Sequence, residues 1–157
     1  MRFLADPPLV KLAKWLRILG YDAFYFRQTD PEILMGKARC EERIVLTRGI
    51  YLGERLASAL LLHLFIQSDH LMEQLRQMDE ARPLLASARL FTRCLTCNEE
   101  LQQVPREVAE GRVPEFVYLT LEPFVECPFC HKVYWPGTHH CRMEERIRAW
   151  LEPEIQS

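Results

Sequence analysis

With 157 residues and a formal net charge of −2, the chain can hold one ordinary domain, or one domain plus a small appendage that needs a staple to fold. Apolar residues make up 48% and charged residues 27%, ordinary globular values that exclude a largely disordered chain. The near-neutral balance also excludes a nucleic-acid binder held by strong global positive charge, although local basic patches stay open.

The first apolar stretch, Leu9 to Leu19, is interrupted by Lys11, Lys14 and Arg17. It is therefore neither the apolar region of a signal peptide nor a membrane span, and no other stretch approaches the roughly 18 uninterrupted apolar residues that a span needs. We expect a cytoplasmic protein that does not bind membranes. In that reducing compartment, paired cysteines indicate metal or redox chemistry rather than disulfides.

The N-terminal half alternates strand and helix patterns. Leucines at helical spacing between Leu9 and Leu19, with Asp6 before them and Gly20 after them, predict the first helix. In chain order we predict a strand at 3–5, this helix, a strand at 23–26, a helix from Pro31 to about Cys40, a strand at 44–47, a short helix at 51–59, a fully buried strand at 61–66, and a helix capped by Ser68-Asp69 that carries Leu71, Met72, Leu75 and Met78. This order favours a parallel sheet with helical crossovers, in a domain at residues 1–87.

Residues 88–157 have a different character, with short strands such as 116–121 and a final helix at about 143–151. A segment of this size without a long apolar core usually needs a cross-link, such as a disulfide or a bound metal ion, to be stable. Two Cys-x-x-Cys pairs can provide this cross-link, because four thiolates can coordinate one zinc ion tetrahedrally. The predicted ligands are Cys94, Cys97, Cys127 and Cys130. Such a closed site folds the appendage and does no chemistry.

Other readings of the thiol and imidazole groups stay open. The candidates to replace a zinc ligand are His131, His139, His140 and Cys141, which otherwise are surface or packing residues. Two independent redox pairs are a further alternative, although a redox Cys-x-x-Cys would begin a helix in a βαβ unit. Cys40 has no nearby partner in the sequence and is expected to be a buried thiol.

Two acidic residues follow predicted strands. Asp6 comes directly after the first strand, and Asp30 follows the second after a short loop. In a parallel sheet both carboxylates could meet at one edge, where hard cations such as Mg²⁺ or Mn²⁺ are held by carboxylates and water. The alternative for each residue is a helix cap, since both stand before a proline at a helix start.

The run FLADPPLVKLAKWLRILGYD, followed by TDPEIL, RIVLTRG, RCLTCNEEL and ECPFCHKVYWPGTHHCRM, resembles the Mut-seven C-terminal RNase domain from Phe3 to about Ile147. The resemblance implies an α/β fold class, a PIN-like parallel sheet flanked by helices and followed by a small zinc ribbon. It also implies a ribonuclease that uses Mg²⁺ or Mn²⁺. Asp6 matches the first acid of the family and Asp30 the second, while Arg17 and Arg48 match its basic positions.

The third family motif is altered, because the family has Thr-Arg-Asp where this chain has Thr47-Arg48-Gly49. Glycine offers no side-chain oxygen, so one implied metal ligand is missing. Glu54 or Asp69 could substitute, and Asp69 at the exit of the fourth strand is the better placed. Its alternative role is the cap of the following helix. The predicted catalytic set is therefore Asp6, Asp30 and Asp69.

Positively charged side chains could surround this edge of the sheet and bind RNA phosphates. They are Lys14, Arg17 and Arg48, together with Lys11. The alternative is a solvated helix face, with Arg17 paired to Asp22. 

The leading hypothesis is a metal-dependent ribonuclease that acts on RNA and carries a structural zinc. The alternative is an inactive adaptor that binds RNA or a protein partner. In that adaptor, aromatic side chains would offer surfaces on which RNA bases stack, namely Phe129, Tyr134 and Trp135. The alternative is that these side chains form the core of the zinc ribbon. A thiol redox protein is the third hypothesis.

Overall fold

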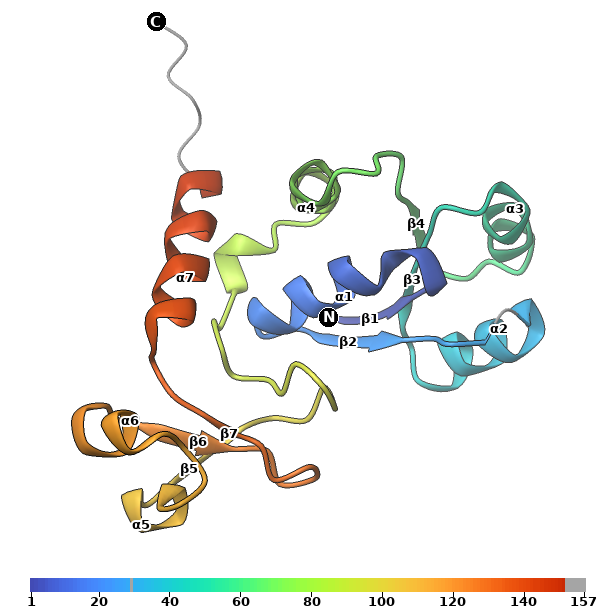
Figure 1. Cartoon of the computed structure of the whole chain (residues 1–157). Coiled ribbons are helices and arrows are strands. Elements are labelled where there is room, and N and C mark those ends of the chain that lie inside the picture. The colour runs from blue at the N-terminus through green and yellow to red at the C-terminus, as the bar shows by residue number, and fades with distance from the viewer. Residues whose placement is uncertain (29, 152–157) are drawn as a thin grey trace, which may run out of the picture. The chain divides into compact units, whose positions relative to one another are not determined.

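The structure is a computed structural model that describes residues 1–28 and 30–151 (Figure 1). The chain divides into two compact units, Met1–Asn98 and Glu99–Ser157. The sequence predicts a domain boundary near Ser87, and the first compact unit continues to Asn98. It does so because the segment around residues 94–98 is hydrogen-bonded to the start of its second strand.

A four-stranded parallel sheet forms the centre of the first unit, as predicted. Its strands are β1 (Arg2–Ala5), β2 (Asp22–Tyr25), β3 (Ile44–Thr47) and β4 (His63–Phe65), in the spatial order β2-β1-β3-β4. The crossovers and flanks are η1 (Pro7–Leu9), α1 (Val10–Ile18), α2 (Pro31–Cys40), α3 (Ile50–Ser58), α4 (Leu71–Ala81) and η2 (Leu85–Ser87). This mixed α/β architecture confirms the predicted fold class.

Helices cover both faces of this sheet. Successive strand residues point to opposite faces, so Leu4 and Val45 lie on one face and pack with Leu34 of α2 and Leu56 of α3. Helices α1 and α4 contact each other, and Figure 1 shows them apart from the pair α2 and α3. Strands covered on both faces have the continuous apolar pattern seen in the sequence.

Two burial predictions are wrong in this unit. The strand predicted as fully buried over 61–66 is the shorter β4, an edge strand in which His63 is half-buried and Phe65 is exposed. An edge strand has one neighbour instead of two, which explains its exposure. Cys40 is also exposed, because α2 buries Leu34, Met35 and Ala38 and its last residue lies off that stripe.

The second unit has a three-stranded antiparallel sheet. Its elements are β5 (Gln102–Val104), α5 (Arg106–Ala109), α6 (Glu115–Thr120), β6 (Phe124–Glu126), β7 (Val133–Tyr134) and α7 (Thr138–Leu151). The strand predicted over 116–121 is wrong, because α6 occupies that segment. Pro114 at the helix boundary and Glu115 in the first turn are helix-start signals that outweigh the β-branched and aromatic run.

Among the residues that the structure describes, no helix combines the length and the apolar character needed to span a bilayer.

Candidate active site and metal centre

The order of the strands defines a switch point in the first unit. From β1 the chain crosses to β2 on one side, and then to β3 on the other side of β1. In open parallel sheets, ligands bind outside the carboxyl ends of the strands at such a point. Asp6 directly follows β1, and Thr47 ends β3 beside it, so both lie at this edge.

Asp6 is tied to the end of β3 rather than to the helix that follows it. The hydroxyl of Thr47 donates to Asp6 Oδ2 at 2.5 Å, and the backbone N–H of Arg48 donates to the same oxygen at 3.2 Å. Although Asp6 stands at the start of η1, its side chain makes no capping hydrogen bond. The alternative that Asp6 caps a helix is therefore wrong.

The other oxygen of this carboxylate is unusual. Asp6 is 5% exposed, and its Oδ1 is buried without a hydrogen-bond partner within the described parts of the chain. Buried polar atoms are nearly always paired, so this oxygen is available to a ligand. Burial raises the pKa of Asp6, and the hydrogen bonds from Thr47 and Arg48 oppose that rise without cancelling it.

Asp30 and Asp69 already have partners. Asp30 is exposed and caps α2, because its Oδ1 accepts the backbone N–H of Glu32 at 2.9 Å. Asp69 is paired with the guanidinium of Arg48, which lowers the pKa of Asp69. Helix α4 has His70 rather than Asp69 as its N-cap residue, and the His70 side chain makes no capping hydrogen bond. Within the described residues, Asp6, Asp30 and Asp69 do not come together as a group of three metal ligands.

Gly49 is the N-cap of α3 and has no side chain to cap it. A Cβ atom at this position would meet Thr47 Oγ1 at 3.5 Å and Leu52 Cβ at 3.7 Å, which is ordinary contact. The backbone φ of Gly49 is −82°, a value that any residue adopts. The position therefore accepts an aspartate without strain. Glu54, the other substitute considered, is exposed farther along α3.

The predicted basic residues do not gather at one place. Arg48 lies at the switch point, and Lys14 is exposed on α1. Arg17 is buried near the other end of the sheet, where its Nε donates to the carbonyl of Ala23 at 2.8 Å. Its Nη1 also donates to the carbonyl of Leu95 at 2.7 Å. These bonds give Arg17 an anchoring role away from Asp6.

A polar network that sequence reasoning missed holds the segment after the first cysteine pair. The Asn98 side chain accepts the backbone N–H of Ala23 at 2.9 Å and donates to Asp22 Oδ1 at 2.6 Å. Arg43 donates to the same Asp22 oxygen at 2.6 Å. Burial acts to raise the pKa of Asp22, but the bonds from Arg43 and Asn98 outweigh it and leave that pKa lowered. A polar residue directly after the second cysteine was the signal available in the sequence.

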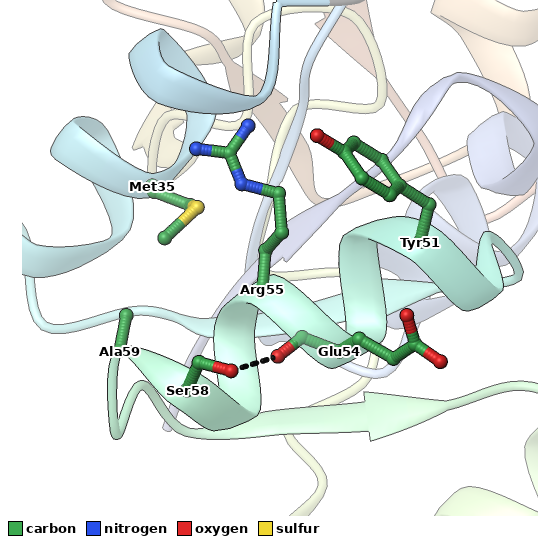
Figure 2. Close-up of a pocket in the computed structure, with 6 residues that line it drawn as sticks. All are labelled: Met35, Tyr51, Glu54, Arg55, Ser58 and Ala59. Carbon is green, nitrogen blue, oxygen red and sulfur yellow. Dashed lines mark hydrogen bonds between the residues drawn. The ribbon is translucent and has the colours of Figure 1, made fainter.

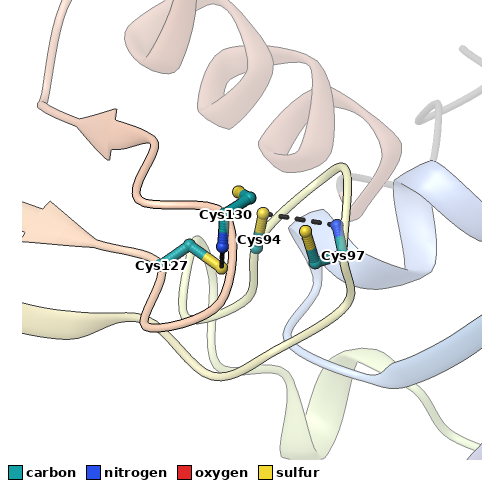
Figure 3. A group of neighbouring side chains, drawn as sticks. All are labelled: Cys94, Cys97, Cys127 and Cys130. Atoms are coloured by element: carbon teal, nitrogen blue, oxygen red, sulfur yellow. Dashed lines mark hydrogen bonds between the residues drawn. The ribbon is translucent and has the colours of Figure 1, made fainter.

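The four predicted zinc ligands lie together, as Figure 3 shows. The Sγ atoms of Cys94, Cys97, Cys127 and Cys130 are all within 4.8 Å of one another. Sulfurs in a tetrahedral zinc site with bonds of about 2.3 Å lie about 3.8 Å apart, so small side-chain movements would complete the site. Four cysteines form a group that can hold a structural metal such as zinc.

Both cysteine pairs have the same local geometry. The N–H of Cys97 points to the sulfur of Cys94 at 3.4 Å, and that of Cys130 to the sulfur of Cys127 at 3.5 Å. The next residue after each pair has a left-handed backbone, with φ of 71° at Asn98 and 59° at His131. Among the alternative ligands, Cys141 is exposed and His131 Nδ1 lies 3.0 Å from Glu126 Oε1.

Comparison with protein families gives a match over most of the chain. The family model described as the Mut7-C RNAse domain matches residues 1–147. No curated protein and no solved structure matches the chain. The matched residues include the switch point with Asp6 and Arg48 and all four clustered cysteines.

Proposed function

Because this chain belongs to the Mut7-C RNAse domain family, we propose that it is a divalent-metal-dependent ribonuclease whose active site lies at the carboxyl ends of β1 and β3. The observation that carries the proposal is the buried, unpartnered Oδ1 of Asp6 at the switch point. An anionic oxygen there has no structural task, because Oδ2 already makes the bonds to Thr47 and Arg48.

The donor set suits a hard cation. Asp6 would hold Mg²⁺ or Mn²⁺ through Oδ1, and Asp30 and Asp69 would each have to leave its present partner to add a further carboxylate. When bound, such a cation lowers the pKa of a water molecule and offsets the charge that develops on the phosphodiester. Thr47 holds the Asp6 carboxylate in one orientation through Oδ2, which would keep Oδ1 in place for a cation.

Arg48 and Lys14 would bind the phosphates of the RNA. Arg48 Nε is buried and unpartnered in the described structure, and its guanidinium is paired with exposed Asp69. A phosphate oxygen would satisfy that nitrogen, and the planar guanidinium suits phosphate geometry. Such contacts hold the RNA backbone without reading its sequence. We leave Arg17 out of this set because of its bonds to backbone carbonyls.

Two observations favour the inactive adaptor as a second candidate. Gly49 stands where the resemblance implies a carboxylate, and the described acids do not form a group of three ligands. Each of these features means that fewer carboxylates would face a cation at this site, and fewer charged ligands weaken metal binding.

An RNA degradation assay with and without Mn²⁺ separates the two candidates. We expect the wild type to cleave RNA only with Mn²⁺, Asp6→Asn to abolish cleavage and Gly49→Asp to increase it. Glu80→Gln, which removes an exposed carboxylate from α4, is the matched control and should cleave like the wild type. If neither the wild type nor Gly49→Asp cleaves RNA, the ribonuclease proposal is wrong and the adaptor is favoured.

A further inference from the structure

A groove of about 480 Å³ lies between α2 and α3 in the first unit (Figure 2). Its volume is within the range of roughly 300–1,000 Å³ that is typical of small-molecule sites. The lining residues are Met35, Tyr51, Glu54, Arg55, Ser58 and Ala59. No step of the proposed reaction uses this groove.

The groove begins beside the proposed active site. Helix α3 starts directly after Gly49, at the carboxyl end of β3, and Tyr51 is in its first turn. Helix α2 starts after Asp30, at the end of the connection from β2. Arg55 joins the two helices, because it forms an ion pair with Glu32 in the first turn of α2. An RNA strand held at Asp6 and Arg48 would therefore meet this end of the groove next.

The aromatic ring of Tyr51 is exposed and is not part of the hydrophobic core. It is 66% exposed, although large aromatic side chains usually bury most of their surface. The guanidinium of Arg55 lies 5.7 Å from the centre of the ring, and Figure 2 shows the two groups turned toward each other at the groove. This cation–π contact favours a defined position for the ring.

We propose that Tyr51 and Arg55 form a subsite for one unpaired nucleotide of the RNA, whose base stacks on Tyr51. The proposal rests on the ribonuclease function. Exposed aromatic rings beside arginine bind bases of single strands without sequence preference, because every base has a flat face. Bases in a duplex are already stacked on their neighbours, so this subsite selects unpaired RNA.

The test measures RNA binding in the non-cleaving Asp6→Asn background, by fluorescence anisotropy of a labelled oligouridine. A second probe of equal length carries the ribose-phosphate backbone without bases. We expect Tyr51→Ala to weaken oligouridine binding about tenfold, equal to about 1.4 kcal/mol, and to leave binding of the baseless probe unchanged. Tyr51→Phe keeps the ring and should bind oligouridine like the background protein.

Phe116→Ala is the matched control, since Phe116 is 72% exposed on α6 and has no part in either proposal. Equal oligouridine binding by Tyr51→Ala and the background protein would overturn the subsite, as would equal losses for both probes. If the wild type still cleaves RNA with Mn²⁺ in that case, the ribonuclease function stands without the subsite. Absence of both cleavage and RNA binding would instead refute the ribonuclease function, and the subsite with it.

Discussion

The hydroxyl of Thr47 donates a hydrogen bond to Asp6 and so connects the ends of two neighbouring parallel strands. Thr47 is fully buried, so this donor is fixed in position. In the proposed enzyme, the bond orients the carboxylate that binds the cation. It also favours the ionised form of Asp6 against the effect of burial.

Thr47→Val, which removes the hydroxyl and keeps the shape, should therefore reduce cleavage about tenfold. Because the lost bond lowers the pKa of Asp6 in the wild type, that pKa should rise further in the variant. The acid limb of a pH–rate profile should then move to higher pH. Thr47→Ser keeps the donor and serves as the control; an unshifted profile in Thr47→Val would show that the bond does not govern Asp6.

Asp6→Asn should stabilise the metal-free protein. Burial raises the pKa of Asp6 above its ordinary value of 3.8, so the folded state binds a proton more tightly than the unfolded state does. Folding stability is therefore lost as the pH rises from below 3.8 through the raised pKa, and the cost persists at neutral pH. Asparagine has no charge to bury, and we expect a gain of about 1 kcal/mol at pH 7. Urea unfolding with a chelator at pH 4 and pH 7 measures it; an equal gain at both pH values would contradict this cause.

Gly49→Asp should have two separable effects. Aspartate is a better N-cap than glycine, so α3 should gain a few tenths of a kcal/mol. The added carboxylate should also tighten Mn²⁺ binding about tenfold, since the cation gains a charged ligand. Gly49→Asn caps the helix without a charge and separates the effects. Thermal melts and Mn²⁺ titration calorimetry measure them, and equal Mn²⁺ affinity in both variants would place position 49 outside the cation site.

Asp22→Asn should destabilise the first unit by about 1–3 kcal/mol at neutral pH, because it weakens the bonds from Arg43 and Asn98. Because the pKa of Asp22 is lowered in the folded state, the stability that Asp22 contributes is present above the ordinary aspartate pKa of 3.8 and is lost as the pH falls through the lowered pKa. The melting temperatures of variant and wild type should therefore converge below about pH 3. Glu42→Gln, at an exposed position, is the control. A constant difference across pH would mean that the charge of Asp22 is irrelevant.

Removal of the metal from the cysteine cluster should destabilise the chain by several kcal/mol, because binding of a structural zinc contributes directly to folding. We expect one zinc ion per chain by elemental analysis, and partial loss of structure by circular dichroism after chelation. Cys127→Ser should lose zinc, since Cys127 is one of the four clustered cysteines. Cys40→Ser, at an exposed thiol outside the cluster, should retain it. A native spectrum in the zinc-free protein would rule out a structural role.

Local patterns were sufficient for the parallel sheet and for the clustered cysteines. They were not sufficient where distant contacts decide. Asp6 and Asp30 have the same signature, an aspartate before proline, yet only Asp30 caps a helix, because Asp6 is buried against Thr47. Likewise, the role of Arg17 depends on the carbonyl of Leu95, far along the chain, which no helical periodicity reveals.

The hydrogen bonds that join Arg17 and Asp22 to residues 95–98 also limit where the chain can be truncated. A fragment that stops at residue 87 would lack the carbonyl oxygens of Leu95 and Thr96 that accept hydrogen bonds from the buried Arg17. Such a fragment is expected to express poorly even though every strand of the parallel sheet is present. A recombinant fragment of the first unit should therefore retain the loop through Asn98.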